Sequence, residues 1–289
     1  MNNMNKTAWV FPGQGSQTAG MGLDLVGHPL AQQRFATAQR ILGWSVLEVC
    51  QPPAENLQKT CYTQPCLYVV ETILADLYTE HPPDYLAGHS LGEYVALYRA
   101  RVYDFETGLR LVKLRAELME QVSGGKMVAL LEPDREQLTA LLAQNPEVVL
   151  ANDNHPGQVV ISGTPAGVAA FLEQIRVKRA VPLAVSGAFH SPWMAGAAAQ
   201  FNEYLQPLPF QDAQVPVLSN TDPTPTTAGQ LLKQRLLNQM TTGVRWREIV
   251  LNLAALGVTQ VVELGPGKVL TGLVKRTAPE VALVNISSL

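Results

Sequence analysis

Cysteine is scarce in this 289-residue sequence, and its spacing excludes two common structural uses. The three residues, Cys50, Cys61 and Cys66, are odd in number and lack a Cys-x-x-Cys pair. A disulfide framework needs paired cysteines and a zinc site needs closely spaced ligands, so we expect neither, and no bound metal. Reduced thiols are typical of a reducing compartment, and the sequence therefore predicts a cytoplasmic protein.

Long runs of apolar residues or of one charge are also missing. No stretch approaches the roughly 18 apolar residues of a membrane span, and residues 1–6 lead into an apolar run too short for a secretory signal. Lysine and arginine number 21 against 24 acidic residues, without the clustered positive charge that binds a phosphate backbone. We expect a soluble monomer that binds neither membrane nor nucleic acid.

The sequence does contain enough apolar material for a large core, since 47% of its residues are hydrophobic. Strand and helix patterns alternate over its first and last parts, with strands predicted at 7–11, 259–264 and 281–284 and helices at 105–122 and 268–276. The segment 220–227, rich in proline and threonine, is expected to be an exposed loop. This alternation predicts an α/β fold.

A different order interrupts the alternation in the middle of the chain. Strands are predicted at 127–131, 148–151, 159–161 and 180–185, with helices at 134–143 and 165–175. This β-α-β-β-α-β order is the split pattern of a ferredoxin-like unit. We therefore expect residues 1–124 and 187–289 to form a large subdomain and 125–186 an inserted small one. A cleft between two such subdomains is a favoured site for ligands.

The pentapeptide at 88–92, Gly-His-Ser-Leu-Gly, stands between the end of an apolar strand at 85–87 and a helix start at 91–97. Glycines two residues on either side of Ser90 let the backbone pack closely through a sharp turn. Such a turn lifts the serine hydroxyl to a helix N-terminus, where the Leu91 N–H can donate to a developing oxyanion. The pattern is that of a nucleophile elbow. A turn that merely caps a helix is the alternative, and the two flanking elements favour catalysis.

A serine hydroxyl is a poor nucleophile near neutral pH and needs a base. The histidines other than His190 are His28, His81, His89 and His155. Three of them lie in polar, turn-like stretches and His89 is fixed inside the elbow, whereas His190 precedes a helix that Ser191 would cap and Pro192 would begin. A helix N-terminus disfavours the imidazolium, so we predict His190 as the base. A partly buried histidine at a helix start is the alternative.

Arg115 lies on the apolar stripe of a predicted helix. Its neighbours three and four residues away are Leu111, Val112, Leu118 and Met119. A guanidinium in that position must reach water or find a carboxylate. Because arginine binds a carboxylate through two parallel hydrogen bonds, a substrate carboxylate is one candidate partner. A structural ion pair is the other, and the residues alone leave both open.

The loop at 12–17, Pro-Gly-Gln-Gly-Ser-Gln, follows the first predicted strand. Its glycines allow the backbone to approach a ligand, and Gln14 could present an amide donor. The loop lacks the spacing and the Lys-Ser/Thr pair of a phosphate-binding loop. An ordinary turn at the end of a strand is the alternative.

Together these motifs resemble the malonyl-CoA:acyl carrier protein transacylases of fatty acid synthesis and the acyltransferase domains of polyketide synthases. The matching segments are 11–17, 88–93, Arg115, 187–191 and 265–267. The resemblance runs from about residue 7 to 289 and implies an α/β-hydrolase-like large part with a ferredoxin-like insertion. It also implies malonyl-CoA and acyl carrier protein as substrates, and no cofactor.

The resemblance assigns a role to each motif. Ser90 takes the malonyl group as an ester, His190 acts as base and then as acid, and Arg115 holds the free carboxylate. The backbone N–H groups of Gln14 and Leu91 form the oxyanion hole.

Three further residues support the site by the same resemblance. A backbone carbonyl near Gln239 orients the histidine in place of a triad acid. Phe189 is typical of relatives that prefer malonyl over methylmalonyl groups. Met119, one turn after Arg115, is expected to support the site as an apolar neighbour of that arginine.

Two other classes share part of these features. A serine hydrolase would have the elbow and the histidine, but it would admit water to the acyl-enzyme and would not need Arg115. A carrier-docking module without catalysis would lack Ser90 or His190, and both are present. Discrete acyltransferases of fatty acid and polyketide synthesis look alike, so a polyketide enzyme stays open beside the expected fatty-acid one.

Basic side chains cluster at two places that could receive an acidic carrier protein. We expect docking near the cleft against Lys275 and Arg276, and the second candidate is the group of Arg176, Lys178 and Arg179.

Overall fold

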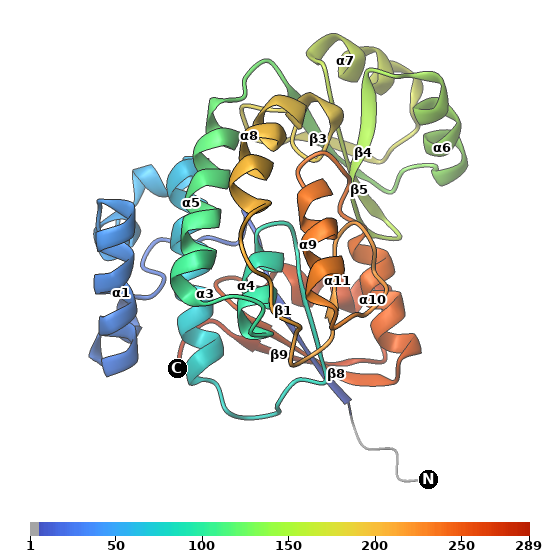
Figure 1. Cartoon of the computed structure of the whole chain (residues 1–289). Coiled ribbons are helices and arrows are strands. Elements are labelled where there is room, and N and C mark those ends of the chain that lie inside the picture. Colours follow the sequence, from blue (N-terminus) through green and yellow to red (C-terminus); the bar gives the residue numbers. More distant parts are fainter. Residues whose placement is uncertain (1–5) are drawn as a thin grey trace.

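The computed structural model describes residues 6–289; the first five residues, where no secretory signal was expected, lie outside the described residues. Within that range the strands form two separate sheets (Figure 1). The larger sheet is parallel, in the order β7-β2-β1-β8-β9. Its strands are β1 (Lys6–Phe11), β2 (Tyr85–Gly88), β7 (Val217–Leu218), β8 (Val258–Leu264) and β9 (Ala282–Ile286).

Helices cover both faces of the parallel sheet because its strands are apolar on both sides. The helices of this part are α1 (Pro29–Leu42), α2 (Val46–Cys50), α3 (Thr60–Leu77), α4 (Gly92–Arg99), α5 (Phe105–Gln121), α8 (Ala195–Leu205), α9 (Gly229–Asn238), α10 (Trp246–Ala255) and α11 (Val269–Thr277). Short 3₁₀ turns are η1 (Leu23–Gly27), η2 (Glu55–Gln58) and η3 (Pro192–Met194). The predicted helices at 105–122 and 268–276 correspond to α5 and α11.

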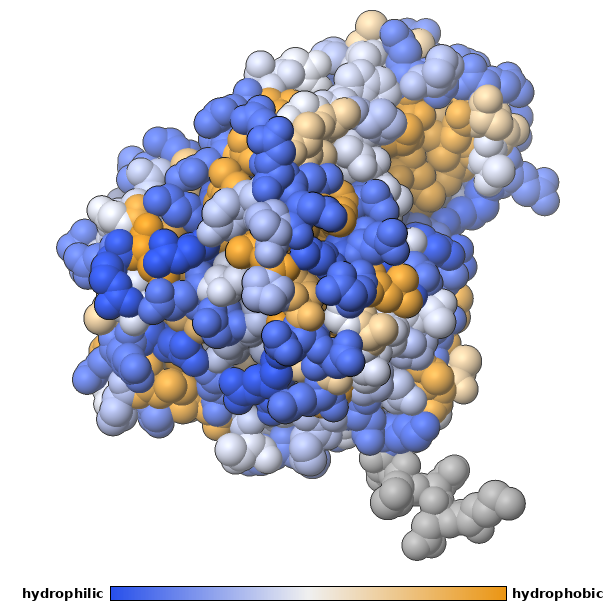
Figure 2. Space-filling view, viewed as in Figure 1, coloured by the Kyte–Doolittle hydropathy of each residue, from blue (hydrophilic) through white to orange (hydrophobic). Residues whose placement is uncertain are grey.

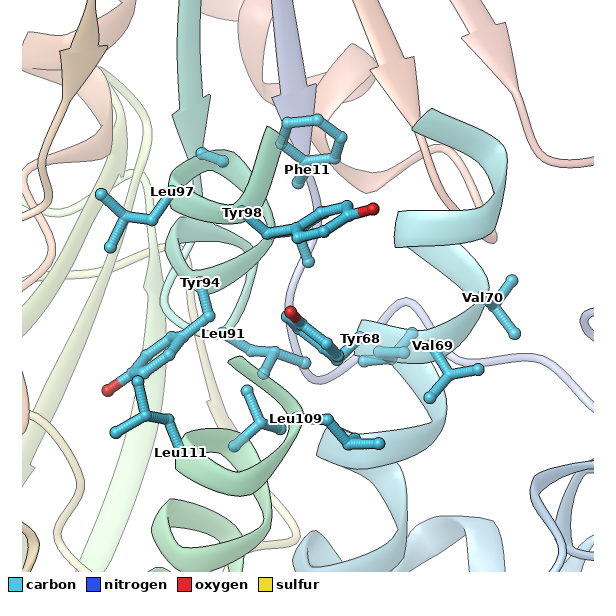
Figure 3. Packing of buried hydrophobic residues seen from close by; sticks show 14 of the residues in the cluster. Phe11, Tyr68, Val69, Val70, Leu91, Tyr94, Leu97, Tyr98, Leu109 and Leu111 are labelled. Carbon is cyan, nitrogen blue, oxygen red and sulfur yellow. The ribbon is translucent and has the colours of Figure 1, made fainter. Parts of the chain in front are cut away.

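The central strand β1 shows how the sequence divides the core. Trp9 and Phe11 belong to the hydrophobic cluster shared with α3, α4 and α5, part of which is drawn in Figure 3. Ala8 and Val10 point the other way, into the cluster shared with α10 and α11. All four are at most 1% exposed. Alternate residues of one strand therefore supply two cores, which holds the strand between two helical layers.

The smaller sheet is antiparallel, in the order β4-β5-β3-β6. Its strands are β3 (Lys126–Leu131), β4 (Val148–His155), β5 (Gln158–Gly163) and β6 (Arg179–Pro182), with helices α6 (Arg135–Gln144) and α7 (Pro165–Gln174). The β-α-β-β-α-β order and the α/β fold are confirmed. These elements lie inside the proposed 125–186 subdomain and have their own core. Figure 2 shows a largely hydrophilic face with its broadest apolar area on this part.

Strand β4 is longer than predicted because it also contacts the large part. The sequence indicated a strand only to residue 151, whereas the structure continues it through polar residues to His155. Val244 pairs with the strand where the extension begins: the Asp153 N–H donates to the Val244 carbonyl at 2.9 Å, and the Val244 N–H donates to the Ala151 carbonyl at 2.8 Å. This contact anchors the small sheet beside the predicted base.

The segment 220–227 is not the exposed loop that the sequence indicated. Thr224 and Thr227 are exposed, but Asn220 is completely buried. The reason is its position directly after β7, at the carboxyl edge of the parallel sheet where the chain turns under the elbow. Within residues 6–289, no helix combines the length and the apolar character needed to cross a membrane.

Candidate active site

Ser90 sits on a turn that only glycines permit at two flanking positions. A Cβ on Gly92 would lie 1.9 Å from the Phe11 carbonyl oxygen, and one on Gly88 would lie 1.9 Å from the Gly92 carbonyl carbon. Ser90 itself has φ 53°, in the left-handed region that side chains rarely adopt. The strand β2 therefore reverses directly into α4, with the hydroxyl lifted above the sheet edge.

His190 meets Ser90 in the geometry of a nucleophile and its base. The distance from Ser90 Oγ to His190 Nε2 is 2.7 Å, and that from His190 Nδ1 to the Gln239 carbonyl oxygen is 3.1 Å. A carbonyl can only accept, so Nδ1 carries the proton and Nε2 is left free to take one from Ser90. His190 also has a positive φ of 55°, so both partners are held in strained conformations.

The pKa of His190 is lowered to about 3, first by burial and second by the positive charge of Arg115. The sequence predicted a helix that Pro192 begins and Ser191 caps; the start at Pro192 is confirmed, and the side-chain cap is wrong. The Ser191 hydroxyl donates to the Ala188 carbonyl instead, and η3 starts without a side-chain cap. Pro192 begins the 3₁₀ turn η3, which continues directly into α8, so His190 does precede a helical run.

Arg115 projects from α5 to the same point and is completely buried. Its Nη1 donates to Gln64 Oε1 at 2.7 Å, and its Nη2 donates to Ser90 Oγ at 3.0 Å and to Gln239 Oε1 at 3.2 Å. Every one of these acceptors is neutral, and no ion pair within residues 6–289 involves Arg115. The guanidinium also lies over the Tyr94 ring, 5.3 Å from its centroid.

The backbone N–H groups of Leu91 and Gln14, which line the cavity with Ser90, have no acceptor in the described part of the chain. The side-chain amide of Gln14 is used elsewhere, because it donates to Thr60 Oγ1 at 3.2 Å. The 12–17 loop abuts the elbow so closely that a Cβ on Gly13 would lie 2.4 Å from the His89 carbonyl oxygen. Two free donors beside a serine nucleophile can together bind an oxyanion.

A cavity of about 100 Å³ opens at this point. Of the residues singled out from the sequence, those lining it are Gln14, Ser90, Leu91, Arg115, Met119, Phe189 and His190. Gln239 lies behind His190. The small part contributes Met127, Asn152 and the neighbouring Leu183. The site therefore lies between the two sheets.

The remaining histidines have local structural contacts. His28 accepts from the Leu30 N–H at the start of α1, and His155 Nδ1 accepts from the Gly157 N–H. The His81 carbonyl accepts from the Trp9 indole. His89 lines the cavity, but its Nε2 contacts Asn154 Oδ1 at 2.9 Å and is not free.

Sequence reasoning missed three buried polar residues around the dyad. Gln64 accepts from Arg115 and donates to Met119 Sδ at 3.4 Å, so Met119 supports the guanidinium through it. Glu93 Oε2 accepts from Gln239 Nε2 at 2.7 Å, and Asn220 contacts Ser90. Glu93 stood in the elbow motif and could have been questioned as a charge in an apolar helix. Gln64 and Asn220 carry no signal in the sequence alone.

Comparison with known proteins gives this geometry its context. A family described as acyl transferase domain matches residues 8–288. A malonyl CoA-acyl carrier protein transacylase from Synechocystis is 58% identical over 286 residues, covering 98% of both chains. The chain belongs to the malonyl-CoA:acyl carrier protein transacylase family. The crystal structure of a Synechocystis transacylase superimposes with a TM-score of 0.96 and covers 98% of each chain.

Other transacylases of this family carry polyketide names. A Bacillus subtilis polyketide-biosynthesis transacylase is 41% identical, covering 93% of this chain and 96% of its own. A malonyl-transacylase solved in complex with a type II polyketide acyl carrier protein is 36% identical, with a TM-score of 0.92 and coverage of 99% and 97%. Both resemble this transacylase less than the Synechocystis enzyme does.

Proposed function

We propose that this protein transfers the malonyl group of malonyl-CoA to the phosphopantetheine thiol of an acyl carrier protein, for fatty acid synthesis, through a malonyl ester on Ser90. The observation that carries the proposal is the Arg115 guanidinium, buried 3.0 Å from Ser90 Oγ with neutral partners only. A site that held only neutral acyl groups would gain nothing from a buried cation.

In the first half-reaction, the Ser90 oxygen attacks the thioester carbonyl while His190 Nε2 takes its proton. The negative oxygen of the tetrahedral intermediate is bound by the N–H groups of Leu91 and Gln14. Collapse of this intermediate breaks the carbon–sulfur bond, and the imidazolium returns its proton to the leaving thiolate. The carrier thiol then attacks the ester by the same steps in reverse, with His190 again as base.

The low pKa of His190 supports this role, because the imidazole is neutral and able to accept a proton throughout the neutral range. Arg115 supplies the selectivity. Its charge lowers the pKa of His190 in the free enzyme, and a malonyl carboxylate would pair with that charge when substrate binds.

A groove of about 510 Å³ supports a docking surface for the carrier protein. Its lining includes Arg276 of α11 and Lys178 and Arg179 of the small part, and these three cations outnumber its one carboxylate, Glu132. The two basic clusters that the sequence offered as alternatives thus contribute to one surface, which we define as these three residues. Strand β6 runs from Arg179 toward Leu183 in the cavity, so a carrier docked here has its prosthetic arm near Ser90. The free cysteines support a reducing, cytoplasmic compartment.

The experiment that tests the function compares hydrolysis of malonyl-CoA with transfer to acyl carrier protein. We expect transfer to dominate, and mass spectrometry after mixing with malonyl-CoA alone to find the adduct on Ser90. Ser90→Ala removes only the hydroxyl, so this folded variant should form no adduct. Dominant hydrolysis would make the protein a serine thioesterase, and an adduct on a cysteine would exclude Ser90 as the nucleophile.

A further inference from the structure

The side-chain amide of Asn220 forms hydrogen bonds to two backbone groups of the strained turn at Ser90. The Ser90 N–H donates to Asn220 Oδ1 at 2.8 Å, and Asn220 Nδ2 donates to the Gly88 carbonyl oxygen at 2.6 Å. One planar group therefore holds the polypeptide just before the nucleophile and at the nucleophile itself. Asn220 is 0% exposed, so water does not compete for these hydrogen bonds.

The sheet register brings Asn220 to this position. Strand β7 runs parallel to β2, with Val217 opposite Leu86 and Leu218 opposite Ala87. Both chains leave the sheet at its carboxyl edge, so the residue two places after β7 lies beside the residues that follow β2.

The buried carboxyl group of Glu93 forms a hydrogen bond with the backbone of Asn220. The Asn220 N–H donates to Glu93 Oε2 at 3.2 Å. The same oxygen accepts from Gln239 Nε2, which also donates to the Ser90 carbonyl oxygen at 2.9 Å. Gln239, which orients His190, and Asn220, which contacts Ser90, thus share Glu93 as an anchor. Glu93 holds the backbone of Asn220, while Ser90 and Gly88 orient its side-chain amide.

We propose that Asn220 is a positioning residue for acyl transfer, which holds the Ser90 turn so that Oγ stays aimed at His190. Residues in sparsely populated backbone conformations persist only where their surroundings over-determine them. Without the amide, the Ser90 backbone can relax from its φ of 53°, and its Oγ moves away from the base. A displacement of about 1 Å in a catalytic group can cost on the order of 100-fold in rate. The proposal rests on the proposed function only in taking Ser90 as the nucleophile.

Two substitutions test this role. Asn220→Asp keeps an acceptor for the Ser90 N–H but turns an oxygen toward the Gly88 carbonyl and adds a charge beside Glu93. Asn220→Ser stays neutral but is too short to bridge both partners. The matched control is Asn252→Asp, because Asn252 Nδ2 donates to the Pro223 carbonyl at 3.1 Å and holds the same segment without touching the elbow.

The measurements are kcat and KM for malonyl transfer, the melting temperature, and the second-order rate at which phenylmethanesulfonyl fluoride modifies Ser90. We expect both Asn220 variants to lose about 30- to 100-fold in kcat and in the sulfonylation rate, with KM within about threefold of wild type. The Asn252 control should stay within about twofold in both rates.

A folded Asn220 variant with the wild-type sulfonylation rate would overturn the proposal, and so would equal losses in the Asn252 control. If Asn220→Asp does not fold, Asn220→Ser decides. Sulfonylation needs only Ser90 and its base, so a wild-type protein that is modified at Ser90 but transfers no malonyl would contradict the proposed function while leaving the role of Asn220 measurable.

Discussion

Two buried arginines in this protein are surrounded differently. Arg235 of α9 is 6% exposed and donates to Asp222 Oδ2 at 2.5 Å and to the Thr224 carbonyl at 2.7 Å. Arg115 of α5 is 0% exposed and donates only to neutral oxygens. The first charge is neutralised within the chain, whereas the second has only the more distant Glu93 as an opposite charge.

The different surroundings of Arg235 and Arg115 indicate different roles for the two arginines. A buried cation without a paired carboxylate is costly to fold, and burial lowers the pKa of Arg115 accordingly. Such a cost is retained where an incoming ligand supplies the missing charge. The region around Arg235 is therefore structural, and we propose that the region around Arg115 receives an anionic acyl group.

Exchanging each arginine for alanine tests the comparison most strongly. Arg115→Ala strands the malonyl carboxylate in an apolar pocket, a loss of about 3–5 kcal/mol, so malonyl transfer should fall by two orders of magnitude or more. Acetyl transfer should hold steady or rise, because the penalty for an unpaired cation disappears while Ser90 and His190 are untouched. The measurement is kcat/KM for both thioesters on folded protein.

The control is Arg235→Ala, which should lower the melting temperature and leave the malonyl-to-acetyl ratio unchanged. An unchanged ratio in Arg115→Ala would remove Arg115 from the substrate site and make the two arginines equivalent.

His190→Ala should slow acylation by roughly 100-fold, the usual effect of losing a general base. His28→Ala, His81→Ala and His155→Ala are the matched controls and should be nearly neutral. Equal damage from one of these three, with the fold intact, would contradict the choice of base.

The pH dependence of the same step sharpens the role of Arg115. An ordinary histidine, with a pKa of about 6.5, is mostly protonated at pH 5. His190, with its pKa lowered to about 3, stays neutral there, so kcat/KM for acetyl-CoA should show no acid limb from this residue above about pH 5. Arg115→Ala removes the charge that disfavours the imidazolium, so the pKa of His190 should rise and the acid limb should move toward neutral pH. If the wild-type rate instead falls below about pH 6.5, and Arg115→Ala does not shift that fall, the effect of Arg115 on the pKa of His190 is contradicted.

Substitution of exposed cations should have the smallest effect on the rate of transfer, because water and salt screen their charges. Lys178→Glu with Arg276→Glu on the docking surface should reduce transfer to the carrier protein by about tenfold at low salt, less at high salt, and spare self-acylation from malonyl-CoA. Arg110→Glu, an exposed charge on α5, is the control and should change neither rate. Equal losses in both half-reactions would exclude this docking surface.

The sequence by itself predicted the α/β alternation, the β-α-β-β-α-β order of the small part, and Ser90 and His190 as a candidate dyad. Local patterns suffice for these features: alternation of apolar residues in the strands and helices, glycines that only a sharp turn requires, and a charge on an apolar stripe. The motifs at Ser90 and Arg115 were predicted because each violates a local rule that a purely structural segment would obey. His190 was predicted by setting aside the other histidines and from its place before a helix.

Only the tertiary structure decided what surrounds those residues. Asn220 lies 130 positions after Ser90 and Gln64 51 before Arg115, and no local pattern relates them. The cause of the low pKa of His190 also needed the fold, because burial and the charge of Arg115 come from other segments. The same holds for the docking surface, since Arg276 and Lys178 share a groove only because α11 packs near β4. Contacts of this kind depend on how strands pair and helices pack, which one-dimensional spacing does not encode.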